Sequence, residues 1–67
     1  MYRYYVNKKL RNGDHEVHRE DCGHLPEEEN RQYLGYFETC QKAVKKAKED
    51  YSNVDGCYYC SNDCHTG

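Results

Sequence analysis

The chain has 67 residues, among them five cysteines, four histidines and eight tyrosines, with one phenylalanine, no tryptophan and a mean hydropathy of -1.32. A chain of this length forms one domain at most, and it buries only about 60% of the surface that its unfolded form exposes. Such a thin core usually needs a metal, disulfides or a partner subunit, so the cysteines and histidines are the first candidates for the missing stability.

The formal net charge of -2 consists of blocks of opposite sign. Residues 1–13 carry four cations and no acid, residues 14–30 carry seven acids against Arg19, and residues 42–48 carry four lysines. A nonspecific nucleic-acid binder usually has a basic surface overall, which this composition does not provide. The start of the chain lacks the basic and apolar regions of a signal peptide, and no apolar run reaches membrane-spanning length. We therefore expect a cytoplasmic protein with reduced thiols and no membrane partner.

Two segments, residues 2–6 and 33–37, are rich in the aromatic and β-branched side chains that favour short strands. Between them, residues 14–18 alternate around Val17 and predict a further strand that returns after a turn. Asn12-Gly13 predicts this turn, because both residues tolerate a positive φ. After residues 14–18, Gly23 and Pro26 interrupt regular structure.

A helical period follows the third predicted strand. Apolar side chains recur at spacings i, i+3, i+4, i+7 and i+11, namely at Cys40, Ala43, Val44, Ala47 and Tyr51. This pattern predicts an amphipathic helix, with Thr39 as its N-cap and lysines on the opposite side. We therefore expect an α+β fold of β-β-β-α order, in which one helix packs on a short three-stranded antiparallel sheet. The ordered core should cover about residues 2–61, with a C-terminal tail over 62–67.

Two pairs of metal-ligating residues stand far apart in the chain. His18-x3-Cys22 is separated by 34 residues from Cys57-x2-Cys60. Each spacing lets one tight turn direct both side chains at a single ion, as a closed tetrahedral zinc site requires. We predict a structural Zn²⁺ held by these four residues. Because an odd number of cysteines cannot all form disulfides within one chain, we favour zinc over the alternative of a disulfide-stapled secreted domain.

The remaining cysteines and histidines offer substitutes for these ligands. His15 and His18 have opposite parity on a strand, so both cannot easily face one ion. Cys40 lies on the apolar side of the helix and is expected in the core, although a helix N-terminus also lowers the pKa of a thiol. The alternate ligands are Cys64, Cys40, His15 and His65. His24 is expected at the surface or beside the ligands.

The motifs follow one another in a recognisable order: His-x3-Cys, Tyr33-Leu34-Gly35-Tyr36-Phe37, a helix containing Cys40-Gln41-Lys42-Ala43-Val44, and Cys57-x2-Cys60. Over roughly residues 15–60 this order resembles the Ada-type metal-binding domain superfamily and the short His/Cys tails of bacterial nucleases and competence-type proteins. The resemblance implies a strand-rich unit with one helix around a zinc. In the Ada repair domains the first cysteine of a Cys-x3-Cys pair accepts a methyl group. This chain has His18 there, so methyl transfer is not expected.

The sequence therefore predicts a small, non-catalytic zinc-binding module, monomeric, whose partner is a nucleic acid or a protein and not a small-molecule substrate. Nucleic acid would be contacted by Arg3, Lys42, Lys45 and Lys46 near exposed tyrosines. A protein partner would use the surplus of tyrosines, which interfaces favour. The alternative is a thiol-based enzyme or redox protein that uses Cys40 or Cys64.

Overall fold

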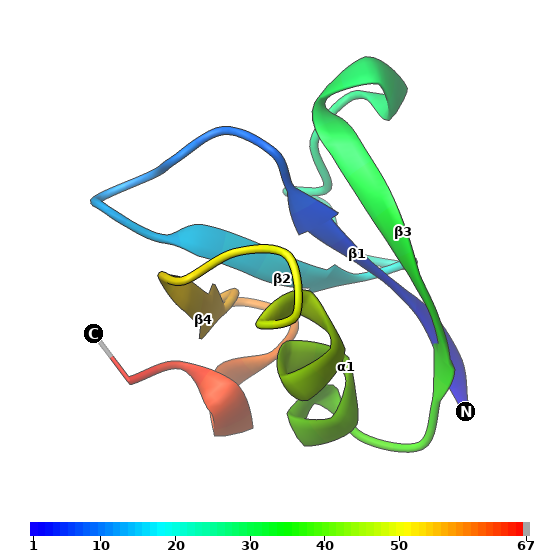
Figure 1. Ribbon diagram of the computed structural model, residues 1–67. Helices are drawn as coiled ribbons and strands as arrows, with labels where there is room; N and C mark the ends of the chain where they lie inside the picture. Colours follow the sequence, from blue (N-terminus) through cyan, green and yellow to red (C-terminus); the bar gives the residue numbers. More distant parts are fainter. Residues whose placement is uncertain (67) are drawn as a thin grey trace.

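The computed structural model describes residues 1–66, and it contains one α-helix and one mixed β-sheet (Figure 1). In chain order the elements are β1 (Tyr2–Asn7), β2 (His15–Arg19), the 3-10 helix η1 (Glu28–Asn30), β3 (Arg31–Phe37), α1 (Cys40–Ala47), β4 (Val54–Gly56) and the 3-10 helix η2 (Asn62–Cys64). The α+β class is confirmed, and each predicted strand overlaps an observed one.

The sheet has four strands in the order β3-β1-β2-β4, so the prediction of a three-stranded antiparallel sheet is wrong in one respect. β1 pairs antiparallel with β2 and β3, as expected, but β4 adds to β2 in parallel. Backbone hydrogen bonds beyond the strand ends extend this pairing, from His15 N to Asn53 O at 2.8 Å and from Cys57 N to Val17 O at 2.9 Å. The parallel strand thereby brings Cys57 alongside β2.

The predicted turn closes the hairpin between β1 and β2. Asn12 and Gly13 both have positive φ, 54° and 86°. The residues on either side, Arg11 and Asp14, exchange backbone hydrogen bonds of 2.8 and 3.1 Å. The two central residues therefore form the tight hairpin tip that an Asn-Gly pair favours.

The strand β3 has an irregularity that decides which of its side chains share a face. Tyr4 pairs with Gly35, whereas the next residue, Tyr5, pairs with Tyr33, so Leu34 is an extra residue in β3. Such a bulge re-aims the side chains on either side of it. Tyr36 opposite Arg3 and Tyr33 opposite Tyr5 consequently lie on the same face of the sheet, although they are three residues apart.

The helix α1 begins as predicted and ends earlier. The hydroxyl of Thr39 accepts a hydrogen bond from Lys42 N at 3.4 Å, which is the expected N-cap. The helix stops at Ala47, and the following backbone turns through bonds from Glu49 N to Lys46 O and from Asp50 N to Ala47 O. Tyr51, predicted as the last apolar position of the helix, therefore packs on the core from a turn.

The core lies between α1 and one face of the sheet. Its buried members are Tyr4, Val6, Val17, Leu34, Cys40, Ala43 and Ala47. The small side chains of Ala43 and Ala47, both fully buried, let the helix lie close to the sheet, and Cys40 is buried as expected. Within residues 1–66, no helix combines the length and the apolar character needed to cross a membrane.

Candidate metal centre

The four predicted ligands come from two places that the fold brings together around the end of β2. His18 projects from the face of β2 opposite to Val17, whose side chain is in the core. Cys22 follows β2 in a turn closed by its N–H to the carbonyl of Arg19 at 3.0 Å. Cys57 directly follows β4, and the bond from Ser61 N to Cys57 O at 2.9 Å closes the turn that carries Cys60.

The geometry of this cluster fits a tetrahedral ion. One ligand atom from each of His18, Cys22, Cys57 and Cys60 lies within 4.8 Å of all the others. Sγ of Cys22 is 3.7 Å from Nδ1 of His18 and 3.9 Å from Sγ of Cys57. Ordinary Zn–S and Zn–N bond lengths give tetrahedral edges of about 3.6 Å between nitrogen and sulfur and about 3.8 Å between two sulfurs. The Cys3His cluster is therefore suited to hold a metal ion.

Backbone amides support the sulfur atoms. Arg19 N donates to Sγ of Cys60 at 3.3 Å, and His24 N donates to Sγ of Cys22 at 3.4 Å. Hydrogen bonds of this kind favour the charged thiolate over the neutral thiol. The two turns therefore do more than place the sulfurs, since they also stabilise the form that binds a metal.

Burial favours the ligand form of the histidine and disfavours that of the thiols. His18 is only 1% exposed, and its burial, together with the charge of Arg11, lowers its pKa to about 4. The imidazole is thus neutral, as a metal ligand must be. Burial also raises the pKa of the Cys57 and Cys60 thiols. Ionising buried thiols without a nearby positive charge is unfavourable. A divalent cation bound among them would instead favour the thiolate form.

The orientation of the imidazole agrees with ligation through Nδ1. Nδ1 faces the sulfur of Cys22, whereas Nε2 lies 3.7 Å from a carboxylate oxygen of Glu16, too far for a hydrogen bond. In the part of the chain that the structure describes, Nε2 of His18 is the single buried side-chain nitrogen or oxygen without a hydrogen-bond partner. A modest approach of the Glu16 carboxylate to Nε2 would form the hydrogen bond that commonly orients a metal-bound histidine from outside the ligand set. No sequence motif singles out Glu16.

None of the alternate ligands joins the cluster. Cys40 and Cys64 form a disulfide with each other, so the expectation of reduced thiols is wrong for this pair, and Cys22, Cys57 and Cys60 are the free cysteines of residues 1–66. His15 lies on the other face of β2, where its ring packs on Tyr51 with 4.2 Å between centroids. His65 Nδ1 lies 3.0 Å from the carbonyl oxygen of Gly56.

The disulfide gives structure to the segment expected as a tail. Asn62–Cys64 form η2, and Cys64 packs against the hydrophobic core. Thr66 N donates to a carboxylate oxygen of Asp55 at 2.8 Å. A thiol reaction at Cys40 or Cys64 would first require reduction of this bond.

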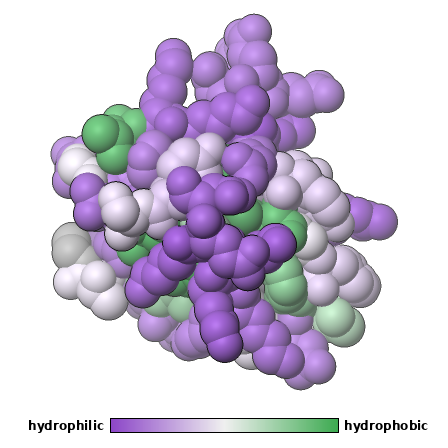
Figure 2. Space-filling view, in the orientation of Figure 1, coloured by the Kyte–Doolittle hydropathy of each residue, from purple (hydrophilic) through white to green (hydrophobic). Residues whose placement is uncertain are grey.

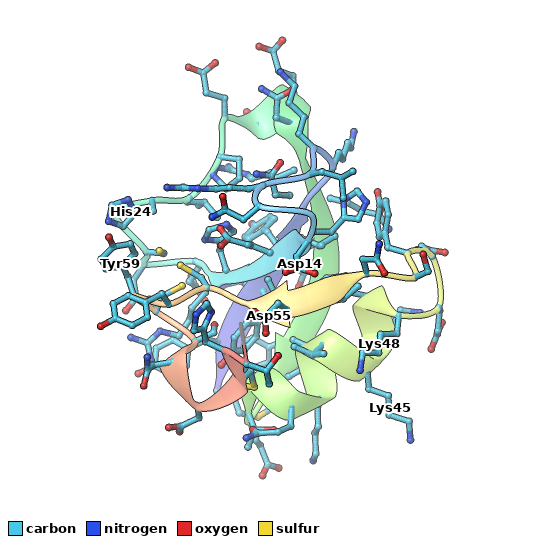
Figure 3. All side chains as sticks on the ribbon, turned by 90° about the vertical axis from the view of Figure 1, so that its left-hand side faces the viewer. Asp14, His24, Lys45, Lys48, Asp55 and Tyr59 are labelled. Atoms are coloured by element: carbon cyan, nitrogen blue, oxygen red, sulfur yellow. A yellow bond between two sulfur atoms is a disulfide. The ribbon has the colours of Figure 1, made fainter. Side chains whose placement is uncertain are left out.

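Aromatic rings surround the metal-binding turn. His24 stacks on Tyr59 with 4.0 Å between ring centroids, and Tyr58 meets Tyr59 edge to face at 5.2 Å. His24 is exposed and its backbone N–H contacts the sulfur of Cys22, so it lies at the surface beside the ligands, as predicted. Figure 3 shows His24 and Tyr59 side by side, on the side of the molecule away from Lys45 and Lys48 of α1.

The four residues expected to contact nucleic acid do not form one surface. Arg3 lies on the sheet face opposite to the helix, since its neighbour Tyr4 is in the core. Two of the helix lysines are engaged locally: Nζ of Lys42 is 4.0 Å from Glu38, and Nζ of Lys46 is 3.1 Å from Glu49. The sequence reasoning overlooked Arg31, which lies on the same face as Arg3, in a strand without acidic residues.

Comparison with known proteins adds no relative to this description: no family model, no curated protein and no solved structure matches the chain.

Proposed function

We propose that this protein is a non-catalytic interaction module whose fold is held by one structural zinc. The observation that carries the proposal is the convergence of His18, Cys22, Cys57 and Cys60, from two separate turns, to within 4.8 Å of one another. Three sulfurs and one imidazole nitrogen are a donor set that zinc accepts in closed structural sites. Softer sulfur ligands disfavour magnesium, calcium and manganese at such a site.

A structural role follows from where the ligands lie. His18 and Cys57 are both buried, at 1% and 2% exposed, and all four tetrahedral positions are supplied by the protein. A catalytic zinc keeps one position for water or substrate. The bound ion would instead join the end of β2 to the segment after β4, where few large apolar side chains are available.

The resemblance to the Ada-type superfamily supports a zinc-binding module, but it does not support the methyl-transfer activity of that superfamily's repair domains. His18 stands where the repair domains have their methyl-accepting cysteine, and a histidine ligand cannot serve as that thiolate. We therefore propose a binding function without methyl transfer. A monomer that binds a nucleic acid or a protein accords with this small fold and its exposed tyrosines.

Elemental analysis of natively purified protein tests the metal, and we expect one zinc per chain. Removing zinc with a chelator should unfold the domain, because structural zinc contributes about 10–16 kcal/mol in small zinc-binding peptides, comparable to or larger than the whole stability of a small domain. Cys57→Ser and Cys60→Ser should abolish zinc binding. Tyr58→Ala, in the same turn but outside the ligand set, is the matched control and should keep one zinc. Metal-free protein that melts cooperatively and gives dispersed amide signals would refute the proposal.

A further inference from the structure

The two strands β1 and β3 form a cationic part of a protein with net negative charge. Residues 1–13 and 31–37 contain no aspartate or glutamate, although the whole chain has twelve. Their cations are Arg3, Lys8, Lys9, Arg11 and Arg31. The same segments hold five of the eight tyrosines: Tyr2, Tyr4, Tyr5, Tyr33 and Tyr36. Cations and aromatic rings are thus concentrated on two adjacent strands.

Several of these side chains share the sheet face that the helix does not cover. Tyr4 and Val6 turn toward α1, so Arg3 and Tyr5 project from the opposite face. Their partners on β3 are Tyr36 and Tyr33, which the bulge places on that same face. Arg31, two positions before Tyr33, adds a second cation. We call this surface the open sheet face, and it consists of Arg3, Tyr5, Arg31, Tyr33 and Tyr36.

Contacts within the open sheet face hold its rings in place. The ring of Tyr5 lies 5.4 Å from that of Tyr33, and the guanidinium of Arg31 lies over Tyr5 at 4.8 Å. The guanidinium of Arg3 lies 5.6 Å from the ring of Tyr36. Tyr33 and Tyr36 nevertheless remain 52% and 54% exposed. Held rings lose less conformational entropy when a ligand stacks on them.

The side of the molecule that carries the helix has a different character. The face seen with the helix in front is mostly hydrophilic, with hydrophobic residues in small separate areas (Figure 2). Its cations are partly paired with acids: Arg19, whose guanidinium lies 4.2 Å from the ring of Tyr2, also donates to Asp21 at 2.6 Å, and Nζ of Lys46 lies 3.1 Å from Glu49. The open sheet face combines exposed rings with guanidinium groups, a combination that binds bases by stacking and phosphates by charge.

We propose that the open sheet face binds single-stranded nucleic acid, with bases stacked on Tyr33 and Tyr36 and phosphates beside Arg3 and Arg31. This inference rests on the proposed function as an interaction module and names its ligand class and surface. A single strand fits better than a duplex, because its bases are free to stack on aromatic side chains. Arg3 has one competing acid, Glu20: one carboxylate oxygen lies 3.8 Å from the guanidinium, and the other accepts a hydrogen bond from Arg3 N at 2.6 Å, so the carboxylate can stay on the backbone while the guanidinium turns to a phosphate. Phosphate can displace such a surface pair at low cost.

The test uses the zinc-loaded full chain and fluorescently labelled twelve-residue oligothymidine and oligouridine, with binding measured by anisotropy. Tyr33→Ala and Tyr36→Ala should each weaken binding by about fivefold or more, the lower end of the effect of one stacked base. Tyr33→Phe keeps the ring and should keep the affinity. Tyr58→Ala is the matched control, because Tyr58 is 58% exposed and contacts the rings of Tyr59 and His65, which are outside the set of residues that form the open sheet face. Zinc content and melting temperature of each variant show that the fold is retained.

Two further measurements separate this proposal from its rivals. Contacts of two arginines with phosphates predict a slope of about -1.4 for the logarithm of affinity against the logarithm of salt concentration. An abasic strand of equal length should bind at least about fivefold more weakly than oligothymidine, since it cannot stack. If polyglutamate or the abasic strand binds as well as oligothymidine, the face recognises charge alone and the proposal fails. Failure to bind either oligonucleotide, with one zinc per chain and intact melting, overturns this inference and leaves the structural zinc unaffected.

Discussion

Replacing Gly56 by alanine tests how the C-terminal segment positions the metal ligands. Gly56 is the last residue of β4 and directly precedes Cys57. A Cβ atom on Gly56 would lie 2.6 Å from Cβ of Cys64 and 2.6 Å from the carbonyl oxygen of Ser61. Real side chains do not approach so closely, and the obstacle includes backbone. The segment that carries Ser61 and Cys64 must therefore move before alanine fits.

The expected cost follows from this overlap. Adding one carbon to a closely packed site typically costs about 1–3 kcal/mol. In a domain of this size each kcal/mol lowers the melting temperature by about 4–8 °C, so Gly56→Ala should melt about 4–24 °C below the parent protein. Ser61 N also donates to the carbonyl of Cys57 at 2.9 Å. If Ser61 moves, this hydrogen bond also displaces the ligand Cys57. The affinity for zinc should therefore fall together with the stability of the fold.

Gly23→Ala is the matched control for this experiment. Gly23 is likewise adjacent to a ligand, since it directly follows Cys22, but a Cβ built on it has no heavy atom within 4 Å. Its replacement should change stability by no more than about 1 kcal/mol in either direction. Thermal melts of zinc-loaded proteins and competition with a chromophoric chelator measure both quantities. If both variants melt alike and hold zinc equally well, the contact of η2 with β4 does not position the metal site.

Two more predictions concern the disulfide and the core. The double variant Cys40→Ala, Cys64→Ala should keep one zinc per chain and lose about 3.5 kcal/mol, the loop-entropy value for its sequence separation of 24 residues; zinc loss in elemental analysis would instead make one of these cysteines a ligand. Burial raises the pKa of Tyr4 above the ordinary value of 10.0. Its neutral phenol therefore adds stability below pH 10, and that stability is lost as the pH rises through the folded-state pKa. Tyr4→Phe should show a smaller fall in melting temperature between pH 8 and pH 11 than the parent protein, and equal falls would contradict this.

The fold could be predicted where a segment of five or more residues has a characteristic residue type or spacing. Two strands have runs of aromatic and β-branched residues, a third alternates around Val17, and the helix has its own spacing. β4 contains only Val54, Asp55 and Gly56, with one large apolar side chain, and its parallel pairing with β2 has no turn signal. The end of the helix was also beyond prediction. Tyr51 fits the helical period, yet it reaches the core equally well after the chain turns at Ala47.

The ligands of the candidate site could be predicted more completely than the strand order of the sheet, because two local sequence rules apply to them. Parity on a strand separates His15 from His18, and the structure places His15 against Tyr51 and His18 in the cluster. The spacings His18-x3-Cys22 and Cys57-x2-Cys60 each fit one turn. No rule of parity or spacing predicts whether Cys64 binds a metal or forms a disulfide. Its nearness in sequence to Cys60 suggested a substitute ligand, whereas η2 turns its sulfur toward Cys40, through the space that a side chain on Gly56 would fill.

Together, the disulfide and the proposed zinc account for a C-terminal segment that the core alone would hold poorly. Of the eight buried hydrophobic side chains, only Cys57 comes from the chain after Ala47. The disulfide at Cys64 joins that segment to α1, and an ion in the cluster with His18 would join it to β2. Five cysteines therefore divide into three thiols that converge with one histidine and two that pair with each other. An odd count, which argues against a pure disulfide scaffold, is what such a division requires.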